Sequence, residues 1–98
     1  MKFGDDKPRI LKALELGMVL HEDRTDQQAK NFVDSGVVSL ELAHKIVSST
    51  RGLQAKSSPH HQYKAITVWV LTPKFEGQQW YVKCYLIEDD LWLLSFHD

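Results

Sequence analysis

QWYVKCYLIEDDLWLLSFH, residues 79–97, is the stretch that decides the fold we predict for this chain. Apolar and polar side chains alternate in its first half, and Trp92, Leu94 and Phe96 place an apolar residue at every second position of its second half, which is typical of β-strands with one buried face. The acidic triplet at 88–90 separates the halves and predicts a turn, so the stretch forms a hairpin of strands 79–87 and 91–97. Placing both apolar faces on one core sets the register, in which Ile87 faces Leu91 and Tyr81 faces His97.

The same alternation assigns the two faces of the hairpin. Tyr81, Lys83 and Tyr85 share the solvent face, and the register brings His97 to the same side. A tyrosine, a lysine and a histidine on the exposed side of a half-buried sheet form a plausible acid/base platform. The residues predicted to be buried on the other face are Val82, Cys84, Leu86, Trp92, Leu94 and Phe96.

The rest of the chain predicts one more strand and three helices. The apolar run 65–71 is the third strand, and the polar segment 53–63, which contains a proline, is predicted to be a loop. Helices are expected from about residue 6 to 16, from 25 to 33, and from 39 to about 51, with Gly17 ending the first. Leu11, Leu14 and Ile46 should point into the core. The predicted N-caps are Asp5 or Asp6, Thr25 or Asp26, and Ser39.

Length and composition favour one α+β domain. Ninety-eight residues with 43% apolar content suffice for one small core. We expect the N-terminal helices to pack on the apolar face of a small C-terminal antiparallel sheet and to leave the other face open. The single cysteine, Cys84, falls on the buried face and has no intrachain partner, which favours a reducing, cytoplasmic location. No apolar run is long enough to cross a membrane, and the N-terminus lacks the apolar segment of a signal peptide.

Charge is unevenly distributed although the net charge is only −1. The stretch 43–75 contains no acidic residue. Such a basic belt suits a polyanion site confined to one face, so RNA phosphates bound there should be released as salt rises. The alternative is a solvated surface on which lysines happen to cluster. The basic residues of the belt are Lys45, Arg51, Lys56, Lys64 and Lys74.

The sequence lacks the motifs of metal and cofactor sites and favours the cleavage of RNA without a metal ion. The adjacent pair His60 and His61 has no cysteine pair or carboxylate at ligand spacing, so we predict no metal site, and no motif predicts a cofactor. RNA can be cut without metal if a base removes the 2′-OH proton, cations stabilise the phosphorane and an acid protonates the 5′ oxygen. Lys56, Tyr81, Lys83 and His97 could supply these groups, while Trp69 and Tyr85, on or near the same face, could stack bases.

A family resemblance points the same way. The strand YVKCYLI at 81–87, the acidic turn and the strand LWLLSFH at 91–97 are similar to the C-terminal hairpin of the MqsR toxins, which belong to the RelE-like bacterial type II toxins. That family has a Tyr-x-Lys strand, a short turn, and an aliphatic strand ending in Ser-Phe and a basic residue. The pair Lys56-Ser57 stands where the family has Lys-Ser after its third helix. An early helix ending in glycine, here LELG at 14–17, also agrees.

The resemblance implies a cytoplasmic, metal-independent endoribonuclease that cuts mRNA and is inhibited by a cognate antitoxin. By this resemblance Lys56 and Tyr81 match active-site residues, and His97 stands where the family has a catalytic lysine. The family also has a Trp-Gln pair on its first strand. Here Trp69 matches the tryptophan and no glutamine follows, which leaves replacement by Thr67 or Gln62, a different specificity, or a degraded site.

The prediction is therefore a toxin ribonuclease with Lys56, Tyr81 and His97 as catalytic residues. Two alternatives stay open: a non-catalytic RNA- or protein-binding module of the same fold, and an unrelated helix-and-sheet protein that dimerises through its aromatic residues. The residues predicted to bind single-stranded RNA are Lys83, Arg51, Trp69, Thr67 and Tyr85.

Overall fold

The computed structural model describes residues 2–21 and 31–98. These residues form two α-helices, α1 (Phe3–Leu16) and α2 (Leu40–Ser48), and one 3₁₀ turn, η2 (Gly52–Gln54). Their strands are β1 (Val19–His21), β2 (Ala55–Pro59), β3 (Thr67–Leu71), β4 (Lys74–Phe75), β5 (Gln78–Gln79), β6 (Tyr81–Ile87) and β7 (Asp90–His97). The result is a small α+β domain, as predicted.

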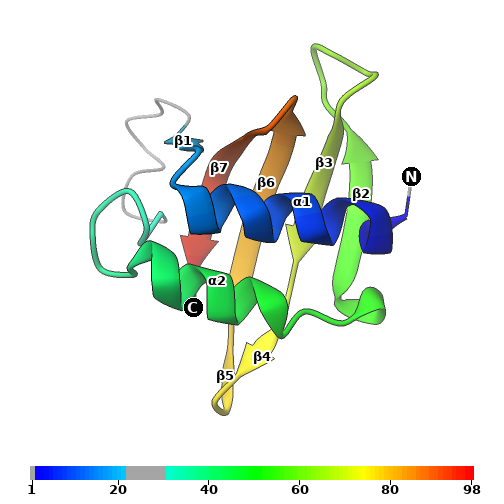
Figure 1. Ribbon diagram of the computed structural model, residues 1–98. Coiled ribbons are helices and arrows are strands. Elements are labelled where there is room, and N and C mark those ends of the chain that lie inside the picture. Colours follow the sequence, from blue (N-terminus) through cyan, green and yellow to red (C-terminus); the bar gives the residue numbers. More distant parts are fainter. Residues whose placement is uncertain (1, 22–30) are drawn as a thin grey trace.

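Five of the strands form one mixed sheet in the order β1-β7-β6-β3-β2 (Figure 1). β1 runs parallel to β7, and the other neighbours are antiparallel. β4 and β5 form a separate small hairpin. In Figure 1 both α-helices lie in front of the sheet, so they are on the same side of it.

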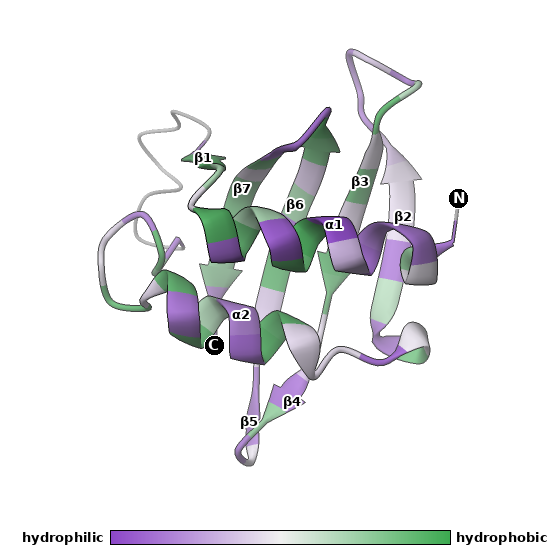
Figure 2. Ribbon diagram, in the orientation of Figure 1, coloured by the Kyte–Doolittle hydropathy of each residue, from purple (hydrophilic) through white to green (hydrophobic). Residues whose placement is uncertain are grey.

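The core combines side chains from helices and sheet. Hydrophobic residues run along the central strands in Figure 2, and α1 and α2 are amphipathic. Burial of each large apolar side chain contributes roughly 1.5–3 kcal/mol. Leu14 and Ile46 are buried as predicted, and Leu11 is partly buried against the same cluster. The buried cluster consists of Phe3, Ile10, Ala13, Leu14, Val38, Ala43, Ile46, Val47, Trp69, Leu71, Val82, Cys84, Leu91, Leu93 and Phe96.

Two predicted helix boundaries are confirmed. Gly17 ends α1 in the left-handed conformation, with φ at 73°, which glycine adopts without a steric penalty. Ser39 caps α2, since its side-chain oxygen accepts a hydrogen bond from the Leu42 N–H at 3.0 Å. The helix predicted from 25 to 33 lies mostly outside the described residues. Asn31 forms an isolated bridge to Phe96 and a turn follows it, so the last predicted residues of that helix are not helical.

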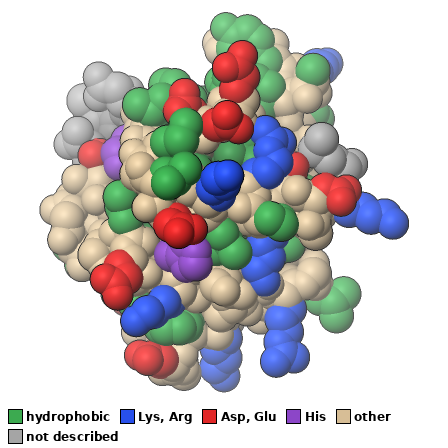
Figure 3. All heavy atoms as spheres, in the orientation of Figure 1, with side chains coloured by type: hydrophobic (Ala, Val, Ile, Leu, Met, Phe, Trp, Pro, Cys, Tyr) green, Lys and Arg blue, Asp and Glu red, His purple; other side chains and the backbone are tan. Residues whose placement is uncertain are grey.

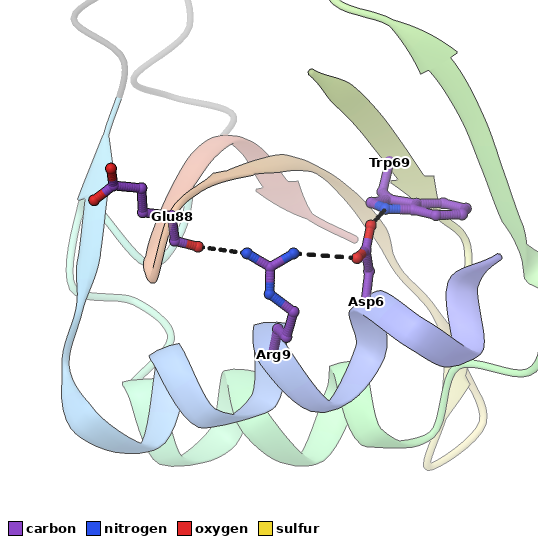
Figure 4. A network of polar contacts seen from close by, with 4 residues as sticks. All are labelled: Asp6, Arg9, Trp69 and Glu88. Atoms are coloured by element: carbon purple, nitrogen blue, oxygen red, sulfur yellow. Dashed lines mark hydrogen bonds and ion pairs between the residues drawn. The ribbon is translucent and has the colours of Figure 1, made fainter. Parts of the chain in front are cut away.

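The start of α1 corrects the sequence prediction and reveals a polar network. α1 begins at Phe3, so Asp6 is not a cap but lies in the helix, 4% exposed. Its carboxylate accepts a hydrogen bond from Trp69 Nε1 at 2.8 Å and pairs with Arg9 at 3.4 Å (Figure 4). Arg9 also donates to the Glu88 carbonyl oxygen at 2.6 Å. The network therefore ties α1 to β3 and to the turn between β6 and β7.

Replacing Asp6 by alanine should lower the free energy of unfolding by roughly 1–3 kcal/mol, because the buried Trp69 Nε1–H loses its acceptor. Urea unfolding measures the loss. Asp6→Asn is the matched control, since the amide oxygen can still accept from Trp69 and only the charge is removed. An equal loss in the two variants would show that the hydrogen bond is not what stabilises this contact.

The hairpin register is confirmed at its open end and corrected at its turn. Tyr81 pairs with His97, as predicted. At the other end Ile87 pairs with Asp90 rather than with Leu91, so the turn is two residues long. Glu88, in that turn, has a positive φ of 54°, as tight hairpin turns require.

A β-bulge overturns part of the predicted core. Cys84 pairs with Leu93 and Lys83 with Ser95, so Leu94 has no partner and the alternation of β7 shifts by one residue. Leu91 and Leu93 therefore fill the core beside Phe96, and Leu86 is partly buried against them. Trp92 and Leu94 were predicted on the wrong face, although Leu94 is buried, as predicted, and Trp92 is half-buried. They join a second, smaller cluster with Val68 and Tyr85.

Two strand boundaries also differ from the sequence prediction. The predicted loop 53–63 is wrong, because Ala55–Pro59 forms β2 and pairs with β3 along its whole length. The strand predicted from 65 begins at Thr67. Within the described part of the chain, no helix is both long and apolar enough to cross a membrane.

Candidate nucleic-acid interface on the open sheet face

A row of paired residues places two lysines on one face of the sheet. Lys56 on β2 pairs with Val70 on β3, and Val70 pairs with Lys83 on β6. Directly paired residues on neighbouring strands point to the same face. Lys56 and Lys83 therefore share a face, with about 10 Å between their Cα atoms because they stand two strands apart. We call this the open face, since it is opposite to the core face that contains Cys84 and Leu71.

Tyr81 and His97 meet on the open face at the ends of β6 and β7. Their rings stack with centroids 5.1 Å apart and planes tilted by 26°, and both residues are half-buried. The His97 Nδ1 atom lies 2.9 Å from the Asp98 carbonyl oxygen. A carbonyl oxygen only accepts, so Nδ1 donates the proton and Nε2 is the nitrogen of the neutral ring that can take up another. This arrangement provides a base beside a phenol.

Next to Lys83, the open face is hollowed and aromatic. A hollow of about 160 Å³ is lined by side chains from β2, β3, β6 and β7 and from the segment after β2. Tyr85 and Trp92 stack beside it with planes only 8° apart and centroids separated by 6.1 Å. The residues lining the hollow are Ser58, Pro59, His60, His61, Val68, Lys83 and Leu94.

His60 and His61 have different positions in this hollow. His60 is 7% exposed, and its Nδ1 accepts hydrogen bonds from the backbone N–H groups of Gln62 and Tyr63 at 3.1 and 3.2 Å. Because Nδ1 accepts, the ring proton is on Nε2, and the ring holds the turn after β2 in place. The exposed His61 ring stacks on His60 at 5.0 Å, with planes 11° apart, and extends the aromatic surface outward.

Five of the eight predicted site residues, Tyr81 among them, lie on the open face. Lys56, Lys83, His97 and Tyr85 share that face, although Lys56 stands on β2 and not on a loop. Tyr85 is 6% exposed, so only part of its ring surface is accessible.

The prediction that Trp69 and Thr67 contribute to the same face is wrong. Trp69 pairs with Cys84, is 3% exposed, and packs in the core against Phe3. Thr67 is two residues away on the same strand and therefore points to the same side as Trp69. Arg51 is exposed ahead of η2 and lines a different hollow. β3 is apolar on both faces, which is why alternation could not assign its sides.

Sequence reasoning also missed part of this surface. Trp92 and Leu94 were assigned to the core, although the bulge turns them outward. Ser58 and His60 lie at the end of a strand that was taken for a loop. The adjacent histidines after Pro59 were the only sequence feature that could have indicated this surface. Their place on the open face becomes clear only from the pairing of β2 with β3.

The described residues, 2–21 and 31–98, contain no group of three or more His, Cys, Asp or Glu side chains placed to hold a metal ion. Comparison with models of known protein families and with curated proteins finds no match for this chain. A functional assignment therefore depends on the geometry of the open face itself.

Proposed function

We propose that this domain binds single-stranded RNA on its open face and cuts it without a metal ion, as a RelE-like toxin of a bacterial type II toxin–antitoxin system acting in the cytoplasm. The observation that carries the proposal is the stacked pair of Tyr81 and His97 on the same face as Lys83 and Lys56. One base, one phenol and two ammonium groups are the components that metal-free phosphodiester cleavage needs. A cognate antitoxin would block this face or change its shape.

The proposed reaction is a transesterification. His97 Nε2 removes the proton of a ribose 2′-OH, and the 2′ oxygen attacks the adjacent phosphorus. The bond from phosphorus to the 5′ oxygen breaks, and that oxygen takes a proton from water. The products are a 2′,3′-cyclic phosphate and a free 5′-OH. Lys83 and Lys56 stabilise the added negative charge, and the Tyr81 hydroxyl donates to a phosphate oxygen and orients it.

The open face favours single-stranded over duplex RNA. Unpaired bases can lie on aromatic rings, which is how proteins commonly bind single strands. The exposed ring of His61 and the half-buried ring of Trp92 provide such surfaces beside Lys83. The lysines of the same row supply positive charge for the phosphates.

The position after Trp69 supports a second candidate, a non-catalytic RNA-binding module of the same fold. Val70 lies on the open face directly between Lys56 and Lys83, where the family resemblance places a glutamine in the site. A valine side chain cannot donate or accept a hydrogen bond. With valine in place of glutamine the surface could still bind RNA. Cleavage would then require that Tyr81 and His97 catalyse the reaction without the glutamine.

Cleavage of a labelled single-stranded RNA in excess EDTA tests the proposal. We expect cutting to continue and the 5′ fragment to end in a 2′,3′-cyclic phosphate. Lys83→Ala should be slowed, whereas Lys12→Ala, an exposed change on α1 outside the basic belt, should cut like the unaltered protein. Slower cutting by Lys83→Ala purified in the same way would exclude a contaminating nuclease as the source of the activity. Binding without cutting would support the second candidate. Absence of both binding and cutting would overturn the assignment of RNA as the ligand.

A further inference from the structure

A second basic hollow lies on the helix side of the domain. It has a volume of about 720 Å³ and forms where α1, the end of α2, η2 and the β4–β5 hairpin meet. Lys7, Arg51 and Lys74 line it from three different elements, and no acidic residue does. Figure 3 shows lysine and arginine side chains gathered in the lower part of this view, where α2 ends and the hairpin begins. We call it the basic pocket.

Two of the residues in the basic pocket are held in place by the fold. Lys7 Nζ donates a hydrogen bond to the Thr50 carbonyl oxygen at 2.9 Å, which fixes the ammonium group and leaves two of its protons for a ligand. Thr50 is 2% exposed, and its hydroxyl oxygen has no hydrogen-bond partner in the structure.

The end of α2 would normally repel an anion, because helix C-termini carry a partial negative charge. Here its last carbonyl groups are already occupied. The Ile46 carbonyl oxygen accepts from the Ser49 hydroxyl at 2.6 Å, and the Val47 carbonyl oxygen accepts from the Thr50 N–H at 3.0 Å. With these carbonyls covered, the three cationic side chains dominate the potential inside the pocket.

We propose that the basic pocket binds a phosphate group, with an RNA strand that extends past Lys56 as the main source. Gln54 lines the pocket and immediately precedes β2, and Lys56 stands at the second position of β2 on the open face. An RNA strand that leaves the open face at the β2 edge would pass from Lys56 to Arg51, because the two residues are only a few positions apart in the protein sequence. That RNA supplies the phosphate group depends on the proposed function. Phosphate binding as such does not.

Titration with inorganic phosphate and tripolyphosphate, followed by amide NMR shifts, tests the pocket directly. We expect saturable shifts centred on the amides of Thr50, Arg51 and Gln54. The exposed residues Arg51 and Lys74 can both be replaced by alanine without disturbing the core, and this double variant should lose the shifts. Lys12→Ala, an exposed change on α1 outside the pocket, should keep them.

A parallel measurement of single-stranded RNA affinity against salt distinguishes the two sources of phosphate. Loss of one phosphate contact should lower the salt slope of the double variant by about 0.7 and weaken binding several-fold. If phosphate caused amide shifts but the double variant kept the same salt dependence of RNA affinity, the ligand of the pocket would be a free phosphate compound and not RNA. If no shifts were seen, the proposal that the basic pocket binds phosphate would be overturned, even if the protein cuts RNA. If shifts were seen in a protein that does not cut RNA, phosphate binding would be supported and the ribonuclease activity would not.

Discussion

Replacing His97 by alanine should slow the cleavage of single-stranded RNA by roughly 10²–10⁴-fold, because a positioned general base contributes about that much to such a reaction. The Nδ1 atom of His97 donates to the Asp98 carbonyl oxygen, so Nε2 is the nitrogen that would act as the base in the proposed reaction. RNA affinity should change little, since Lys56, Lys83 and the aromatic surface remain. The measurement is single-turnover cleavage with saturating protein, which separates the chemical step from binding.

Three further variants make the result specific. His44→Ala changes a histidine on α2, away from the open face, and should cut at the normal rate. Tyr81→Phe keeps the stacking surface for His97 and removes only the hydroxyl, so a smaller loss is expected. His97→Lys keeps a proton-carrying group and should move the working pH upward, because lysine has the higher intrinsic pKa. If His97→Ala and Tyr81→Phe both left the cleavage rate unchanged, the mechanism proposed for His97 and Tyr81 would be overturned.

The C-terminal hairpin was the most predictable part of the molecule. Strict alternation in the strand that contains Tyr81 and Lys83, with an acidic turn after it, predicted the pairing of Tyr81 with His97 from local pattern alone. The bulge at Leu94 was not predictable, since Leu93 and Leu94 are equally apolar and either could have faced the core. A one-residue change in register exchanges the faces, which is how Trp92 was misplaced.

The remaining errors concern strands without a clear pattern. β2 contains Lys56, two serines and a proline, so nothing in its sequence distinguishes it from a loop, and only pairing with β3 makes it a strand. β1 is three residues long and pairs with a strand some 70 positions later in the chain. Such nonlocal pairing leaves no trace in a local pattern. The candidate site spans β2, β3, β6 and β7, and β2, which carries Lys56, belongs to it only through its pairing with β3.

The buried thiol of Cys84 should make the domain sensitive to alkali. Burial, together with a smaller contribution from the nearby Asp6 carboxylate, raises the pKa of Cys84 from 9.0 to about 12. Below pH 9 the thiol is protonated in both the folded and the unfolded chain, so this stabilising contribution is fully present. Between pH 9 and 12 the unfolded chain releases the proton and the folded chain does not. The free energy of unfolding should therefore fall by roughly 1.4 kcal/mol per pH unit, or about 4 kcal/mol over the window.

Urea unfolding at pH 7, 9, 10 and 11 measures this loss, and Cys84→Ala is the matched control. Alanine leaves a small cavity, which lowers stability equally at every pH, so the informative quantity is the slope above pH 9. The slope should be flatter in Cys84→Ala by roughly 1.4 kcal/mol per pH unit, because lysines and tyrosines titrate in both proteins. In the native protein at pH 8 the thiol should also react with a thiol reagent far more slowly than in urea. Parallel slopes, or rapid labelling of the native protein, would contradict the burial of Cys84 in the core.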